Sequence, residues 1–198
     1  MSLKIVIAIV CGLVLGRFVT HIELDNIIDN ILNIGLYVLL FFVGMDIGRS
    51  QNLFNDLKAL GLKIFIIPVC IAIGSIAGSA AVGLLMGMPF NESAAVGAGF
   101  GWYSLSGVIL SKTGGAQIGA LAFITNVLRE VLAIVLIPVV AKKIGFIEAI
   151  APAGATAMDT TLPVISKSTN GKVGLISFIT GVVLSAMVPF LVPLLSAI

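Results

Sequence analysis

The stretch IGALAFITNVLREVLAIVLIPVV, residues 118–140, decides the fold of this chain. It has the length of a membrane-spanning helix, because a bilayer core of about 30 Å requires about 20 apolar residues. Three polar residues, Asn126, Arg129 and Glu130, interrupt the stretch near its midpoint. At about 100° per residue, all three are predicted to share one face of the helix.

These three residues are costly inside a membrane, since each charge at a helix centre costs about 2.5–3.5 kcal/mol on the insertion scale. Ionisable groups in such segments usually face a protein-lined cavity and mark the path of a substrate or an ion. We therefore interpret the polar face as part of a transport path. The alternative is structural: Arg129 pairs with Glu130, or each polar residue is tied to another helix.

The composition predicts an integral membrane protein. The 198 residues are 59% hydrophobic and 10% charged, with a mean hydropathy of +1.21, whereas soluble domains carry about 25% charge. The apolar runs favour helices in contact with membrane lipid over a barrel. No basic patch with interleaved aromatic residues occurs, which argues against nucleic acid as a partner. Cys11 and Cys70 lack a cysteine or histidine companion, so we expect no metal site and no cofactor.

Seven apolar segments are predicted, and together they form one all-α membrane transport domain over residues 1–198. They are about residues 3–19, 27–47, 60–86, 93–110, 118–140, 146–165 and 173–198. The first resembles a signal peptide but lacks a small-residue cleavage site, so we predict a retained span. Small residues spaced one turn apart, including Gly74 and Gly78 in the third segment and Gly181 and Ser185 in the seventh, predict helix-packing faces.

Loop charges predict the orientation of these spans. With the N-terminus inside and seven crossings, the inner side holds Lys4, Arg49, Lys58, Lys63, Lys112, Lys167 and Lys172, and the outer side holds Arg17, Lys142 and Lys143. The positive-inside rule then favours an inner N-terminus and an outer C-terminus. If segment 93–110 or 146–165 re-enters the membrane instead of crossing it, the later loops change side.

Segment 93–110 is unusual because Gly97, Gly99 and Gly101 are spaced two residues apart and so cannot line one helix face. Each glycine costs about 1 kcal/mol of helix stability relative to alanine. We predict a broken segment near mid-depth that lines a cavity. The residues that follow are expected to supply an aromatic wall and hydroxyl groups: Trp102, Tyr103, Ser104 and Ser106. The alternative is a kinked packing helix with an interfacial aromatic belt.

Segment 146–165 is the second irregular one, containing IAPAGATAMDTTLPVI at residues 150–165. Pro152, Gly154 and Pro163 bracket Asp159 and Thr160. Transporters commonly build their sites from discontinuous helices whose ends face the substrate. The alternative is a loop outside the membrane in which Asp159 caps a helix.

Three classes of function compete. The first is a secondary transporter with a midplane site drawn from segments 93–110, 118–140 and 146–165. The second is an intramembrane enzyme, but no serine lies in a GxSxG motif and His21 lies outside the apolar runs, which leaves only an Asp46–Asp159 dyad. The third is a membrane subunit of a larger complex, in which the polar residues serve assembly. We predict a transporter and no enzymatic activity.

Three blocks of sequence resemble the LysO family of bacterial lysine exporters: GFGWYSLSG at 99–107, NVLRE at 126–130 and MDTTLP at 158–163. The resemblance implies export of L-lysine, and of analogues such as thialysine, across the cytoplasmic membrane. It places the family's important intramembrane acids at Glu130 and Asp159. The wider superfamily is similar to bile-acid and sodium/proton transporters, which implies inverted repeats with two crossing broken helices.

The chemistry of lysine agrees with these residues. Glu130 and Asp159 are expected to bind its two amines, while Arg129 or half-helix N–H groups meet its carboxylate. Without lysine, the two acids would bind H⁺ or Na⁺, which makes the predicted protein an antiporter; the alternative is a cation/proton antiporter without an amino-acid substrate. The full set of expected substrate-binding residues is Glu130, Asp159, Asn126, Arg129, Trp102, Tyr103, Ser104, Ser106 and Thr160.

Longer family members carry further membrane segments before the part that this chain matches. Seven spans are too few for the ten-helix inverted-repeat plan that the superfamily resemblance implies. We therefore expect the transporter to be completed by a small membrane partner chain or by a homodimer.

Overall fold

The computed structural model describes residues 61–198 and, before them, residues 11, 14, 34, 38, 41 and 45. Apart from these six positions, the predicted spans 3–19 and 27–47 lie outside the described residues, as does Asp46. From residue 61 onward the regular elements are helical. They are η1 (Gly61–Phe65), α4 (Ile66–Leu85), α5 (Phe90–Gly97), α6 (Tyr103–Thr113), α7 (Ala116–Lys143), η2 (Glu148–Ile150), η3 (Gly154–Met158), α8 (Leu162–Ser168) and α9 (Gly171–Ser196).

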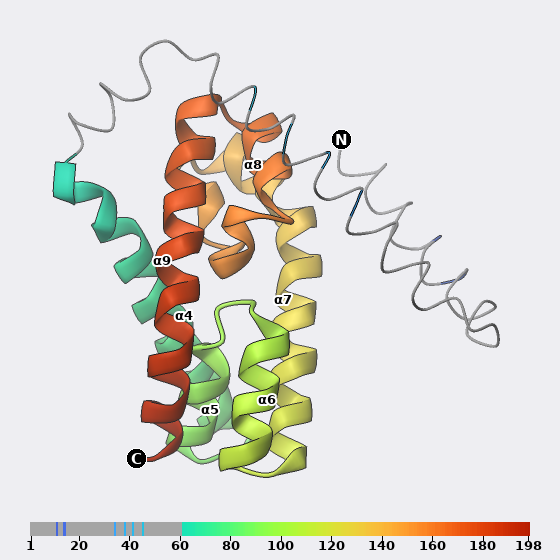
Figure 1. The fold of residues 1–198 in the computed structure, drawn as a ribbon, viewed down its shortest axis with the longest axis vertical. Coiled ribbons are helices and arrows are strands. Elements are labelled where there is room, and N and C mark those ends of the chain that lie inside the picture. The colour runs from blue at the N-terminus through green and yellow to red at the C-terminus, as the bar shows by residue number, and fades with distance from the viewer. Residues whose placement is uncertain are drawn as a thin grey trace.

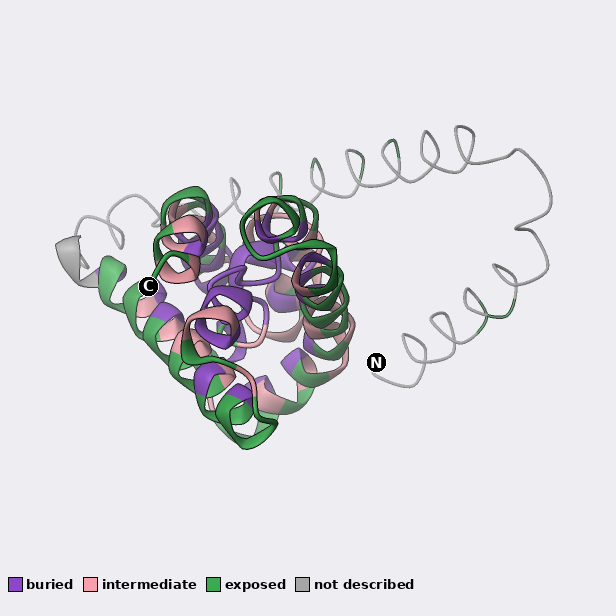
Figure 2. Ribbon diagram, turned by 90° about the horizontal axis from the view of Figure 1, so that it is seen from below, coloured by how far each residue is buried: buried purple, intermediate pink, exposed green. Residues whose placement is uncertain are grey.

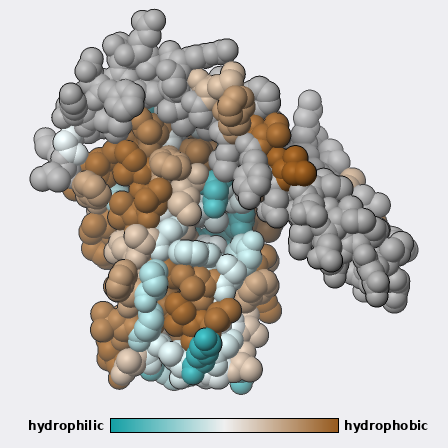
Figure 3. All heavy atoms as spheres, in the orientation of Figure 1, coloured by the Kyte–Doolittle hydropathy of each residue, from teal (hydrophilic) through white to brown (hydrophobic). Residues whose placement is uncertain are grey.

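Three of the described helices, α4, α7 and α9, are long and apolar enough to cross a membrane. They correspond to the predicted segments 60–86, 118–140 and 173–198. Large apolar side chains such as Leu128, Leu132 and Leu136 of α7 are exposed. The buried residues of the helices face the middle of the bundle and the exposed ones face outward (Figure 2). Apolar side chains cover much of the visible surface of the described part (Figure 3), as expected for helices in contact with lipid.

The other two predicted segments, 93–110 and 146–165, each fold into a hairpin of short elements. The first hairpin, residues 90–113, contains α5 and α6 and lies between α4 and α7 in the chain. The second hairpin, residues 147–168, contains η2, η3 and α8 and lies between α7 and α9. The two hairpins lie at opposite ends of the bundle and their tips meet near its middle (Figure 1). Re-entry into a membrane, the total of seven spans and an inverted repeat stay predictions.

The tip of the first hairpin is shaped by backbone that only certain residues adopt easily. Helix α5 ends at Gly97, and α6 begins at Tyr103. Between them, Phe100 has a φ of 48° and Gly101 a φ of 102°; φ angles in this range favour glycine. A Cβ atom at Gly99 would overlap the side chains of Asn126 and Ser106. The glycines therefore allow both the sharp turn and its close approach to α7.

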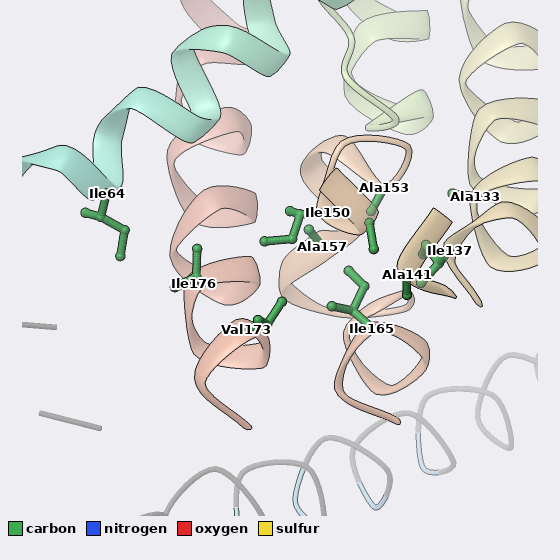
Figure 4. Close-up of a cluster of buried hydrophobic side chains, with 11 residues drawn as sticks. Ile64, Ala133, Ile137, Ala141, Ile150, Ala153, Ala157, Ile165, Val173 and Ile176 are labelled. Atoms are coloured by element: carbon green, nitrogen blue, oxygen red, sulfur yellow. The ribbon is translucent and has the colours of Figure 1, made fainter. Parts of the chain in front are cut away.

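Each hairpin packs on a buried apolar cluster of its own. Ile150 and Ile165 of the second hairpin lie with Ile137 of α7 and Ile176 of α9 in one cluster (Figure 4). Phe100 of the first hairpin lies in another, together with Leu184 and other residues of α9. Helix α9 therefore contributes to both cores, and its buried residues include Gly181 and Ser185 of the predicted packing face. A Cβ atom at Gly181 would overlap Met158, so this glycine lets the second hairpin approach α9 closely.

Candidate functional site

A cavity of about 150 Å³ lies where the two hairpin tips meet α7 and α9. Its lining residues come from four separate parts of the chain: Gly101, Trp102, Tyr103, Ser104, Glu130, Ala155, Thr156, Met158, Asp159, Thr160 and Ser185. Six of the predicted site residues are therefore brought together here, namely Trp102, Tyr103, Ser104, Glu130, Asp159 and Thr160.

Two carboxylates face this cavity from different elements. Glu130 projects from the middle of α7, and Asp159 follows the last residue of η3 in the second hairpin. Both side chains are half-buried. The backbone N–H of Thr160 donates a 2.6 Å hydrogen bond to Oδ1 of Asp159, and the Thr160 hydroxyl lies 3.4 Å from the same oxygen. This geometry holds Asp159 in place, and the side chain of Thr160 also hydrogen-bonds to Glu130, so that one threonine is shared by the two acids.

The first hairpin contributes the opposite wall. Trp102, Tyr103 and Ser104 occupy the start of α6, whose N-terminus has no side-chain cap. The N–H groups of the first helical turn have no intrahelical partner and carry the positive end of the helix dipole. The ring of Tyr103 is fixed by an edge-to-face contact with Phe123, with 5.3 Å between ring centroids and 82° between planes. The cavity therefore combines two acids with one positively polarised helix end.

Asn126 lies outside this cavity and fixes the tip of the first hairpin through hydrogen bonds to its backbone. Its Oδ1 accepts a 2.7 Å hydrogen bond from the backbone N–H of Gly101. Its Nδ2 donates to the carbonyl oxygens of Ala122 (2.9 Å) and Val96 (3.3 Å) and lies 3.4 Å from the Ser106 hydroxyl. Ser106 in turn donates to the carbonyl of Trp102 at 2.8 Å. Asn126 and Ser106 are both buried. They support the backbone of the tip and do not line the cavity.

Arg129 also lies away from the two acids. Its guanidinium donates to the Ser75 hydroxyl of α4 at 2.6 Å, and to the carbonyl oxygens of Pro152 and Ala151 at 3.2 and 3.3 Å. No carboxylate within residues 61–198 forms a salt bridge with it, so the Arg129–Glu130 pairing considered above is not what the described structure contains. The three polar side chains of α7 thus reach different parts of the structure: Asn126 the first hairpin, Arg129 the carbonyls of the second hairpin and Ser75, and Glu130 the cavity.

Several cavity residues were not among those expected from sequence. Gly101, Ala155 and Met158 offer backbone or apolar surface; Gly101 belongs to the glycine-rich break that was predicted to line a cavity, but no side-chain chemistry marks these three positions as binding residues. Ser185 belongs to the small-residue face of α9, which predicts packing but does not by itself indicate a site. No group of three or more histidine, cysteine, aspartate or glutamate residues within the described part could hold a metal ion.

The profile of the family described as "Lysine exporter LysO" matches residues 6–196 of this chain. The chain belongs to the LysO family. A relative named lysine exporter LysO, from Escherichia coli K12, is 34% identical over 162 residues, which cover 82% of this chain and 54% of that protein. A provisionally named lysine exporter from Haemophilus influenzae is 33% identical over 162 residues, covering 82% of each chain. No solved structure matches.

This LysO chain spans about half the length of the Escherichia coli relative. The three blocks that carry the LysO resemblance, 99–107, 126–130 and 158–163, are far apart in the sequence. All three contribute to the wall of the cavity: the first at one tip, the second through Glu130 and the third at the other tip. Membership of a family of exporters fits a transport function better than an enzymatic one.

Proposed function

We propose that this chain is a secondary transporter that exports L-lysine, and analogues such as thialysine, across the cytoplasmic membrane. The observation that carries the proposal is the pair of carboxylates, Glu130 and Asp159, in one cavity at the junction of two hairpin tips. Ionisable residues within membrane segments are costly and mark substrate paths. The names of the two relatives provide the substrate.

The cavity offers a partner for each charged group of lysine. Glu130 and Asp159 bind the two amines, and Trp102 and Tyr103 lie against the aliphatic stem and the ammonium. Since Arg129 is bonded elsewhere, the substrate carboxylate is assigned to the N–H groups that follow Tyr103 in the first turn of α6, because the N–H of Tyr103 itself donates to the carbonyl of Gly101 at 3.0 Å. The hydroxyls of Ser104 and Thr160 complete the polar lining.

Exchange is the proposed driving step. When lysine leaves, two half-buried acids in one cavity repel each other, and binding of H⁺ or Na⁺ relieves this repulsion. Glu130 and Asp159 then alternate between lysine and the coupling cation, which makes the transporter an antiporter. The transport unit includes a second chain, either a small membrane partner or another copy of this one.

The distribution of lysines supports an orientation. Lys142 and Lys143 end α7, Lys167 lies in α8 and Lys172 begins α9, all at the upper end of the bundle in Figure 1. Among residues 61–198 the opposite end carries Lys112, near the end of α6. By the positive-inside rule the lysine-rich end is cytoplasmic and the C-terminus is outside. Relative to seven full crossings, Lys112 and the Lys142–Lys143 pair change side.

The proposal is tested by lysine export from cells that lack other lysine exporters and are loaded with a lysine-containing dipeptide. The intact chain is expected to lower internal lysine, and Glu130→Gln and Asp159→Asn to abolish this effect. Glu148→Gln is the matched control, because Glu148 is exposed and lies outside the cavity. Normal export by both cavity variants would disprove the assignment of the site. If the intact chain exports only with a co-expressed membrane partner, the second-chain part of the proposal is supported.

A further inference from the structure

The guanidinium of Arg129 contacts the end of a short arm, residues 147–153, which consists of η2 and the turn that follows it. Ala151 and Ala153 have helical φ and ψ angles, and Gly154, with a φ of 63°, ends the arm. Nε and Nη2 of Arg129 donate to the carbonyls of Pro152 and Ala151 in the last turn of this arm. The last carbonyls of a helix have no intrahelical donor and carry the negative end of its dipole, so a cation there is stabilising.

The same guanidinium is connected to the end of a second helix. Nη1 of Arg129 donates to the Ser75 hydroxyl at 2.6 Å, and that hydroxyl donates to the carbonyl of Gly97 at 2.8 Å. Gly97 is the last residue of α5. The carbonyl ends of the first arms of both hairpins therefore converge on one cation, and this cation is not among the residues that line the proposed substrate cavity.

We propose that Arg129 is a positioning residue, whose guanidinium is the counter-charge for the C-terminal ends of α5 and of the 147–153 arm and thereby holds both hairpin tips at the substrate cavity. This inference deepens the proposed function. Arg129 acts on transport through the tips, without contact to lysine. Its geometry requires a planar group with several directed donors, which a lysine ammonium only partly replaces.

The test combines two measurements on the full chain. The first is hydrogen-exchange mass spectrometry in nanodiscs, which requires no transport and therefore stands even if lysine is the wrong substrate. Arg129→Gln and Ser75→Ala are expected to accelerate amide exchange in peptides covering 98–104 and 151–158 by about tenfold or more, with a smaller effect for Arg129→Lys. Ser79→Ala is the matched control, since its hydroxyl donates to the carbonyl of Ser93 at 2.6 Å and takes no part in the hydrogen bonds from Arg129 to Gly97.

The second measurement is inhibition of labelled lysine transport by unlabelled lysine and by lysinamide, which lacks the carboxylate. Arg129→Lys and Ser75→Ala are expected to lower the maximal rate about 10-fold while the ratio of the two inhibition constants stays as in the wild type. The inference is overturned if exchange at both tips is unchanged in Ser75→Ala and Arg129→Lys. It is equally overturned if Arg129→Lys changes that ratio tenfold, because Arg129 would then bind the carboxylate. Should Arg129→Gln fail to fold, these two variants decide alone.

Discussion

The backbone N–H of Ala155 donates a 2.8 Å hydrogen bond to the carbonyl oxygen of Phe100, and this bond joins the tips of the two hairpins. Both residues are buried. Phe100 adopts a φ of 48°, a conformation that is uncommon for a bulky residue. Strained backbone of this kind persists where its surroundings hold it and is typical of functional sites. The proposed substrate cavity is thus built around a main-chain contact between two hairpins from opposite ends of the bundle.

Gly154→Ala should damage this junction. Gly154 has a φ of 63°, and a Cβ atom there would overlap the carbonyl oxygen of Phe100 and lie 3.0 Å from Nη2 of Arg129. We expect lysine export to fall tenfold or more and thermal stability in detergent to decrease. Gly87→Ala separates strain from overlap, because Gly87 has a φ of 79° but no atom within 4 Å of a Cβ. That variant should lose only the strain energy, about 1–2 kcal/mol, and keep export. Equal loss of export in the two variants would contradict this account.

Thr160→Val should weaken lysine binding moderately. The substitution removes the hydroxyl beside Asp159 but keeps the 2.6 Å backbone hydrogen bond. A hydrogen bond of this type contributes about 1 kcal/mol, so we expect the apparent KM for lysine to rise about fivefold. Thr169→Val serves as control, since its hydroxyl bonds locally to Ile165 and lies outside the cavity. An unchanged KM in Thr160→Val would remove Thr160 from the proposed binding residues.

Asn126→Leu should destabilise the first hairpin. Leucine fills a similar volume but leaves the buried N–H of Gly101 without its acceptor, which costs about 1–3 kcal/mol. We expect a lower unfolding temperature together with a tenfold loss of export. Asn170→Ala provides the comparison, because it removes the N-cap of α9, where Oδ1 accepts from Val173 at 3.0 Å, and costs about 1 kcal/mol of helix stability. It should lower stability and spare export; loss of export from both would show that stability alone governs it.

The orientation can be read by cysteine labelling of intact cells. In a background with Cys11 and Cys70 replaced by serine, a membrane-impermeant maleimide should label Lys112→Cys from outside and should label Lys143→Cys only after the membrane is opened. Seven full crossings would give the reverse pattern at both positions. The experiment therefore decides whether the two hairpins re-enter the membrane from opposite sides.

The long helices could be predicted from sequence because a long apolar run by itself indicates a helix in contact with lipid. Apolar length alone identifies α4, α7 and α9, and the small residues Gly181 and Ser185 of α9 are buried as the spacing predicted. The interrupted stretches were recognisable for a related reason, since closely spaced glycines and prolines are costly in a continuous helix. Patterns of this kind do not show which other element a predicted packing face will contact. Gly78 of α4, predicted to pack in the same way, has no atom within 4 Å of an added Cβ among the described residues.

The roles of Asn126, Arg129 and Glu130 in α7 could not be assigned from sequence, because they depend on which elements pack against this helix. A helical wheel puts Asn126, Arg129 and Glu130 on one broad face, yet each side chain reaches a partner from a different part of the chain. Which of them faces the cavity is set by where the hairpin tips lie, and this follows from tertiary packing. The acids at 130 and 159 were recognised through the cost of burying charge, whereas the bonds of Arg129 to backbone carbonyls have no counterpart in the sequence pattern.

The link between Ala155 and Phe100 uses main-chain atoms only, so its donor and acceptor persist with any side chain at these positions except proline at 155, which has no N–H. The length of each hairpin arm, by contrast, determines whether this donor and acceptor meet. Removing one residue from a helical arm shortens it by about 1.5 Å and rotates everything beyond by about 100°, which would turn the tip amide away from its acceptor. Homologues of this chain should therefore differ freely in the composition of the hairpins and very little in their lengths. An ester in place of the amide at residue 155 would remove the link while keeping every side chain.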